Sequence, residues 1–288
     1  MKEYTRTDLA LEKKTSSKDG TIAELCREER VGEAMISEIA LKKEGAEDRY
    51  VTVSRERLWD ADGTDFDELT TLIALEIRKI ARRVSGKEPN TDFGVLIAGL
   101  GNSEITADAI GPLTVKNLTV TRHLREFEPS LYTKLGTCEI SAFAPGVLGQ
   151  TGIETAELIL GAVQNSKPDI VIAVDALAAR SCERLASIVQ ISDAGISPGS
   201  GIGNTRRAIT EESLGVPVIS IGVPTVVNSS TLVYDALEKA GIEKIDKDLE
   251  SVLETGRSFF VTPKESDVIT KHISALLAES ISKAFSAI

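Results

Sequence analysis

The sequence predicts an α/β fold, a three-layer sandwich in which helices cover both faces of a mostly parallel β-sheet. Short runs of continuously apolar, often β-branched residues are typical of strands that are buried on both faces. These runs alternate along the chain with segments whose apolar residues recur at helical spacing. The expected strands are residues 50–54, 95–98, 170–174, 187–192 and 217–223, and the expected helices are residues 69–80, 151–165, 226–240 and 265–284.

Length and charge limit the functions that the chain can have. It has 288 residues, of which 42% are hydrophobic, so it can bury a sizeable core in one large domain or two modest ones. Its formal net charge of −11 repels phosphate backbones. We therefore expect no direct binding of nucleic acid, and we interpret the basic residues 78–83 as the solvated face of a helix.

Cysteine usage and hydropathy indicate a cytoplasmic protein. Cys26, Cys138 and Cys182 are far apart and lack CxxC spacing, which is typical of reduced, buried thiols. No apolar run approaches the ~18 residues of a membrane span, and the N-terminus lacks the apolar region of an export signal. The chain has two histidines, His123 and His272, so we do not expect a catalytic metal. No cofactor and no membrane partner are expected either.

Two aspartates that follow buried strands are the main candidates for catalysis. Asp108 comes after the strand 95–98 and a Gly-x-Gly-Asn loop at 99–102, and Asp175 directly follows the strand 170–174. Ligand sites in open parallel sheets form beyond the carboxyl ends of the strands, so we expect both carboxyls near that edge. Two carboxyls that share one proton split their titration, and one can then activate water while the other polarises a carbonyl.

Other interpretations of these motifs remain open at the level of sequence. An Asp after a strand often caps the next helix. Loop 99–102 lacks the third glycine of a dinucleotide fingerprint, and the glycine-rich residues 198–204 predict either an anion cradle or a plain turn. The alternatives to a paired-carboxyl enzyme are a nucleotide- or phosphate-binding α/β protein and a non-enzymatic acidic scaffold.

Several windows of the sequence occur in an order that resembles the germination protease family of spore-forming bacteria. They cover residues 4–10, 99–112, 141–147, 174–180, 190–193 and 198–204. The resemblance extends over nearly the whole chain. It implies a fold similar to the hydrogenase-maturation endopeptidases, described as phosphorylase/hydrolase-like. It also implies an endopeptidase of the forespore or spore core that starts the breakdown of small acid-soluble spore proteins during germination.

The resemblance further implies how such an enzyme is made and which residues act. Family members are homotetrameric zymogens that remove their own N-terminal segment and need no cofactor. Two aspartates are held to carry their catalysis, and these match Asp108 and Asp175. The roles of base and acid are not assigned to either residue by the sequence.

The opening of the chain looks like a cleavage site of this family. Members cut after an acidic residue, ahead of an apolar residue and Ala, with Glu two places further on, and residues 7–12 (TDLALE) have this layout. We therefore expect self-cleavage between Asp8 and Leu9. Residues 1–8 would be a pro-segment within a leader of about 20 residues, and 9–288 a single catalytic α/β domain. The alternative is the start of a strand or helix that is not processed.

The acidic side chains of a substrate call for a basic group in the cleft, and the sequence does not choose among several. The candidate arginines are Arg122, Arg180, Arg206 and Arg207. Gly101 and Asn102 of the glycine loop, together with His123, complete the predicted substrate-binding set. His123 also has an interpretation as a structural histidine.

Overall fold

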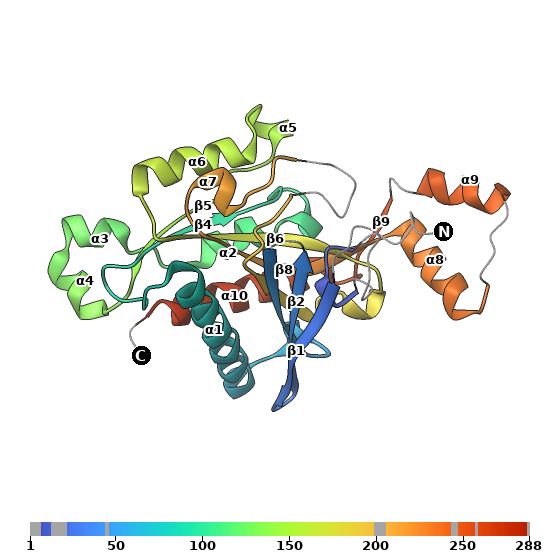
Figure 1. Ribbon diagram of the computed structural model, residues 1–288, viewed down its shortest axis with the longest axis horizontal. Coiled ribbons are helices and arrows are strands. Elements are labelled where there is room, and N and C mark those ends of the chain that lie inside the picture. The colour runs from blue at the N-terminus through green and yellow to red at the C-terminus, as the bar shows by residue number, and fades with distance from the viewer. Residues whose placement is uncertain are drawn as a thin grey trace.

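The computed structural model describes residues 7–12, 22–43, 46–198, 206–242, 247–256 and 259–286. These residues form an α/β fold in which one large sheet is flanked by helices (Figure 1). The strands are β1 (Ile22–Val31), β2 (Ala34–Lys43), β3 (Ala46–Ser54), β4 (Gly94–Gly99), β5 (Glu139–Phe143), β6 (Ile170–Ala179), β7 (Ile188–Ser192), β8 (Val218–Asn228) and β9 (Phe260–Val261).

The helices lie mostly between the strands in sequence. They are α1 (Gly63–Ser85), α2 (Ile110–Asn117), α3 (Arg122–Phe127), α4 (Pro129–Leu135), α5 (Leu148–Thr151), α6 (Thr155–Ser166), α7 (Glu211–Leu214), α8 (Ser229–Lys239), α9 (Lys247–Gly256) and α10 (Ser266–Ala284). Short 3₁₀ turns occur at Ala10–Glu12, Leu58–Asp60, Thr106–Asp108 and Cys182–Arg184. In the described ranges, none of the helices is long and apolar enough to cross a membrane.

The sheet is mixed, with the strand order β1-β2-β3-β7-β8-β6-β4-β5 and with β9 paired to β8. The neighbours β5, β4, β6 and β8 are parallel, whereas β7, β3, β2 and β1 follow in antiparallel pairs. The expectation of a mostly parallel sheet therefore holds for the first group alone. For β1 and β2 the reason is local, because a tight turn joins them in which Gly32 has a φ of +59°, and such hairpins make antiparallel pairs.

Helices cover both faces of the parallel strands, and this explains why those strands are continuously apolar. On β4, Val95 and Ile97 pack in one cluster with residues of α1, α2 and α10. The alternate residues Leu96 and Ala98 pack in a second cluster with α6 and α7. Because successive side chains of a strand point to opposite faces, both sets have to be apolar. Figure 1 shows α6 and α7 on one side of the sheet and α1 and α10 on the other.

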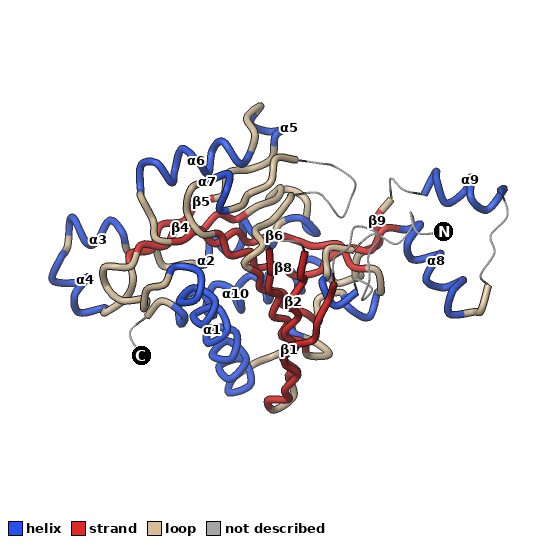
Figure 2. Tube along the Cα trace, in the orientation of Figure 1, coloured by secondary structure: helices blue, strands red, loops and turns tan. Residues whose placement is uncertain are grey.

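Two element boundaries differ from the sequence prediction in a way that affects the site. β6 continues to Ala179, so Asp175 lies within this strand rather than just after it. β8 continues to Asn228, and the helix expected from residue 226 begins at Ser229. The Asn228 side chain caps that helix by accepting hydrogen bonds from the backbone N–H groups of Ser230 and Thr231. Figure 2 shows the strands running through the molecule toward α8 and α9 at one end.

Candidate active site

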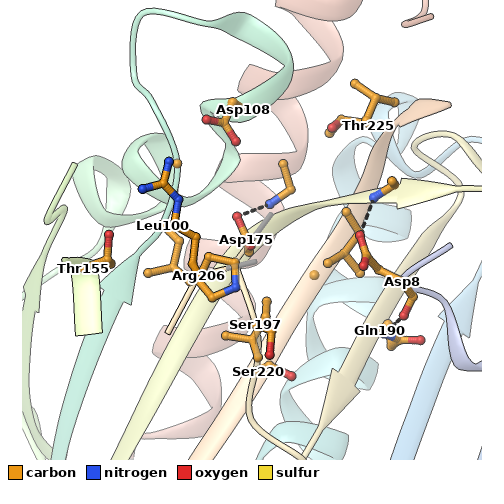
Figure 3. Close-up of a pocket in the computed structure, with 18 of the residues that line it drawn as sticks. Asp8, Leu100, Asp108, Thr155, Asp175, Gln190, Ser197, Arg206, Ser220 and Thr225 are labelled. Carbon is orange, nitrogen blue, oxygen red and sulfur yellow. Dashed lines mark hydrogen bonds between the residues drawn. The ribbon is translucent and has the colours of Figure 1, made fainter. Parts of the chain in front are cut away.

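A cavity of about 1090 Å³ opens at the carboxyl end of β4, where the neighbouring strands β6 and β8 continue along it (Figure 3). Its lining includes the loop that follows β4, the outer half of β6 and residues of β8. On the other side, β3 and β7 of the antiparallel group contribute residues as well. Both candidate aspartates, Asp108 and Asp175, line this cavity. Its position is the one expected for a ligand site in an open α/β sheet.

Asp175 is a buried carboxyl on β6, with 6% of its surface exposed. One of its oxygens accepts a hydrogen bond from the backbone N–H of Ala176 at 2.9 Å. Burial and the negative charge of Asp108 raise the pKa of Asp175 well above its ordinary value, and the charge of Asp8 adds to this shift. Figure 3 shows the Asp175 side chain between Asp108 and Asp8. The two acids that the sequence singled out therefore share one cavity and interact electrostatically.

Asp108 ends the 3₁₀ turn Thr106–Asp108 and is half-buried. Its Oδ2 accepts a hydrogen bond from the backbone N–H of Asn102 at 2.7 Å. Burial raises the pKa of the Asp108 carboxyl, and this hydrogen bond from Asn102 opposes the shift. The glycine loop thus donates an N–H group to the Asp108 carboxylate. In the alternative of a phosphate-binding loop, this N–H group would bind the phosphate instead.

Gly101 allows this close approach. It has a φ of +107°, and a Cβ added there would lie 2.0 Å from the Asp108 carbonyl oxygen and 3.0 Å from Oδ1 of Asp108. A side chain does not fit in this space, so the glycine is needed both for the backbone conformation and for the contact. Gly101 and Asn102, which the sequence predicted at the substrate site, both line the cavity, and their observed contacts hold Asp108.

Two threonines that no sequence motif marks hold the turn that carries Asp108. Thr225 of β8 donates from Oγ1 to the Ala107 carbonyl at 2.6 Å. Thr270 of α10 donates from Oγ1 to the Thr106 carbonyl at 3.2 Å. Both threonines are almost fully buried. A single hydroxyl within an apolar element carries no motif in sequence, so this support becomes visible only in the folded chain.

Residues of the N-terminal segment lie in the same cavity. Thr7 and Asp8 are part of its lining. The Asp8 N–H donates to the Ala178 carbonyl at 3.0 Å, and the Asp8 carboxylate accepts from the Ala178 N–H at 2.9 Å. Leu9, 1% exposed, packs with Leu177 and Ala179 of β6 and with further apolar residues of β7 and β8. The predicted cleavage site is therefore bound beside Asp175.

The end of this segment is held by backbone groups that follow β6. The Glu12 carboxylate accepts hydrogen bonds from the N–H of Arg180 at 2.8 Å and from the N–H of Ser181 at 3.3 Å. It also accepts the hydroxyl of Thr7. The acidic residue four places after Asp8 is thus held by neutral donors of the main chain.

The predicted arginines have different surroundings. The Arg180 side chain forms ion pairs with Asp235 and Glu238 of α8, so its backbone rather than its guanidinium meets the N-terminal segment. Arg206 lines the cavity and has no ion-pair partner among the described residues. Its neighbour Arg207 is exposed and does not line the cavity.

Two predicted substrate residues lie away from the cavity lining. Arg122 and His123 are on α3, where Arg122 pairs with Glu139 at 3.1 Å and His123 is exposed. The structure does not bring either residue together with the two aspartates. Of the glycine-rich loop 198–204, residues 199–204 lie outside the described residues. Within the described ranges, no group of three or more His, Cys, Asp or Glu side chains is arranged to hold a metal ion.

Two interacting carboxyls beside a bound stretch of chain, in the cleft of an α/β fold, can supply the acid and the base for hydrolysis of a peptide bond. Comparison with known proteins gives the class its name. The family model described as germination protease matches residues 2–250. The chain belongs to the germination protease family and is a protease, which confirms the main prediction from sequence.

Individual relatives are similar over most of the chain. A germination protease of Caldanaerobacter subterraneus subsp. tengcongensis is 40% identical, with 97% of this chain and 93% of the relative covered. One of Clostridium acetobutylicum is 36% identical, with 96% and 93% covered. A germination protease of Bacillus subtilis is 45% identical over 70% of this chain and 53% of its own length.

Proposed function

We propose that the protein is an endopeptidase that starts the degradation of small acid-soluble spore proteins in the spore core, using Asp108 and Asp175 to hydrolyse peptide bonds after acidic residues. The observation that carries the proposal is the pairing of these two carboxyls in one cavity, beside a bound segment with the layout of a cleavage site. Membership of the germination protease family supports the substrate class and the expected homotetrameric zymogen.

The surroundings of the two acids favour different roles for them. Asp175 is the more deeply buried, and two negative charges disfavour its ionised form. Asp108 is partly exposed, so its ionised form is less costly, while each of the two carboxyls accepts one backbone N–H group. When two carboxyls share one proton, the proton stays on the site where ionisation costs more. Asp108 is then the base that takes a proton from water, and Asp175 is the acid.

The bound N-terminal segment supports self-processing between Asp8 and Leu9. Three features of the expected cleavage pattern have partners in the folded chain: Asp8 accepts the Ala178 N–H, the apolar Leu9 is buried, and Glu12 accepts backbone N–H groups. In this proposal residues 1–8 are the pro-segment and 9–288 the catalytic part. Spore-protein substrates bind in the same places, and Arg206, which lines the cavity, attracts their further acidic residues.

The test is the replacement of each acid by its neutral isostere. The full chain carrying Asp108→Asn or Asp175→Asn is purified and followed by intact mass, together with cleavage of a spore protein. Both variants are expected to stay uncut and to lose at least ~100-fold of activity, the scale of removing an acid–base group. Asp62→Asn is the matched control, because Asp62 is exposed and its side chain caps nothing. Full activity in both variants would disprove the proposal.

A further inference from the structure

Gln190 is a buried amide on β7 that faces the cavity. Its backbone lies in register between Thr52 of β3 and Gly222 of β8, at the junction of the antiparallel and parallel strands. The side chain lines the cavity, and the residue is 7% exposed. A buried amide is costly unless its oxygen and nitrogen both find partners. Its partners therefore show what this position is built to bind.

Both partners of the Gln190 amide belong to the backbone around the predicted cut. Its Oε1 accepts a hydrogen bond from the Ala10 N–H at 2.7 Å. Its Nε2 donates to the Asp8 carbonyl oxygen at 3.3 Å. The orientation of the amide follows from these partners, since a carbonyl can only accept and an N–H can only donate. Among the described residues the side chain has no other hydrogen-bond partner.

We propose that Gln190 is a catalytic residue that holds the carbonyl of the cleaved bond through Nε2 and fixes the position of the chain beyond the cut through Oε1. This inference depends on the proposed function, because it takes the Asp8–Leu9 bond as the bond that is cut. In this proposal the neutral amide of Gln190 polarises the carbonyl, so the proton of Asp175 remains available for the departing amine.

Hydrolysis of the Asp8–Leu9 bond needs only water, the two aspartates and Gln190. The oxygen of a water molecule bonds to the Asp8 carbonyl carbon, and Asp108 takes the proton that the water loses. Negative charge develops on the carbonyl oxygen, where the N–H of Gln190 meets it, and a hydrogen bond to a charged acceptor becomes shorter and stronger. The bond from carbon to the Leu9 nitrogen then breaks, and that nitrogen takes the proton of Asp175. A proton moving from Asp108 to Asp175 restores the pair.

The hydrogen bond from the Ala10 N–H restricts which residue a substrate can have at this position. Because Oε1 needs an N–H two places after the cut, a substrate with proline at that place lacks the donor. The amide contacts main-chain atoms alone, so this hydrogen bond does not select among the other side chains. Proline in place of Ala10 in a peptide of the sequence TDLALE is therefore expected to prevent cleavage.

The experiment measures the first-order rate of self-processing of the full chain by intact mass. Gln190→Ala is expected to slow processing about 100-fold, the usual effect of losing one donor to a developing oxyanion. Gln164→Ala is the matched control, since Gln164 lies on α6 and is exposed. Thermal unfolding is recorded for each variant, so that a loss of the fold is not counted as a loss of catalysis.

Gln190→Glu separates a catalytic role from a structural one and does not depend on the folding of the Ala variant. Ionised, this side chain offers only acceptors to the carbonyl oxygen, so the rate at neutral pH is expected to be no higher than in Gln190→Ala. Protonated, it regains an O–H donor. The processing rate relative to wild type is therefore expected to rise on acidification, and a flat ratio contradicts the proposal.

The outcomes for Gln190 and for the aspartates are distinguishable. If Gln190→Ala processes within about threefold of Gln164→Ala while Asp108→Asn and Asp175→Asn stay uncut, the role of Gln190 is wrong and the paired-carboxyl mechanism stands. If the aspartate variants process normally, the proposed function itself is wrong. Slow processing in both sets supports both proposals.

Discussion

The two halves of the sheet contribute different chemistry to the same cavity. The parallel strands β4, β6 and β8 place the two acids, Asp175 on β6 and Asp108 on the turn that Thr225 of β8 holds. The antiparallel strand β7 places Gln190, a neutral side chain that contacts backbone atoms. The acids and the neutral amide therefore lie on different strands, so that substitutions can disturb one set of groups without removing the other.

The largest expected effect comes from disturbing the parallel half at Gly101. Gly101→Ala puts a Cβ 2.0 Å from the Asp108 carbonyl oxygen, at a φ of +107° that an L-residue rarely adopts. We expect displacement of Asp108, loss of self-processing by at least ~100-fold, and a loss of about 2–3 kcal/mol of stability. Intact mass and denaturant unfolding measure the two effects.

Gly152→Ala is the control for Gly101, because Gly152 also has a positive φ, +70°, but an added Cβ there meets nothing within 4 Å. It is expected to cost about 1 kcal/mol and to leave processing intact. Equal losses of activity in the two variants would show that the contact with Asp108 is irrelevant.

An intermediate effect is expected on the pH dependence of stability. Because the pKa of Asp175 is raised above its ordinary 3.8, Asp175 keeps its proton in the folded chain at pH values at which the unfolded chain has lost it. The stability that this proton gives is fully present below about pH 4 and is lost as the pH rises through the raised pKa. Asp175→Asn removes the titration, so it is expected to unfold at a higher temperature than wild type at neutral pH.

The unfolding temperature of Asp175→Asn is expected to rise by about 2–4 °C for each kcal/mol that wild type spends on burying the charge of Asp175. This difference from wild type is expected to shrink toward zero near pH 4. Thermal unfolding from pH 4 to pH 8 measures it. A constant difference across this range, or a less stable variant at neutral pH, would contradict the assignment of a costly buried charge to Asp175.

The smallest expected effect is at Arg180, whose backbone meets Glu12 while its side chain pairs with Asp235 and Glu238. Arg180→Ala keeps the backbone N–H and is expected to change the processing rate less than about threefold, with a stability cost below ~1 kcal/mol. Glu12→Gln weakens the charge-assisted hydrogen bonds and is expected to slow processing by about tenfold. If Arg180→Ala is the slower variant, the guanidinium holds the substrate acid instead.

The sequence was sufficient for β4, β6 and β8 of the parallel half and for the two acids, whereas β5, which is mostly half-buried, was not predicted. A strand buried on both faces has an unmistakable apolar run, and the position of Asp108 and Asp175 after such runs predicted a common edge of the sheet. The antiparallel half was less predictable. β1 carries many charged, exposed residues, so it lacks the apolar pattern by which a strand is recognised.

The neutral and basic residues of the site show why the remaining site residues could not be predicted from sequence. The strand of Gln190 was predicted, but its place beside β3 and β8 depends on long-range pairing that no local pattern encodes. Arg122 and His123 have suitable chemistry, but α3 lies away from the cavity lining. For Arg180 the choice between side chain and backbone was decided by acidic neighbours on α8, which are more than 50 residues away in the sequence.

The docking of Leu9 has a consequence for the enzyme after processing. The proposed cut between Asp8 and Leu9 releases the residues before it, whereas Leu9 and Glu12 have their contacts on the far side of the cut. The new chain end is a tethered product with an effective concentration that short tethers bring into the millimolar range. If the enzyme is processed as proposed, each incoming spore protein has to displace this end, so the substrate competes with the N-terminus of the cut enzyme.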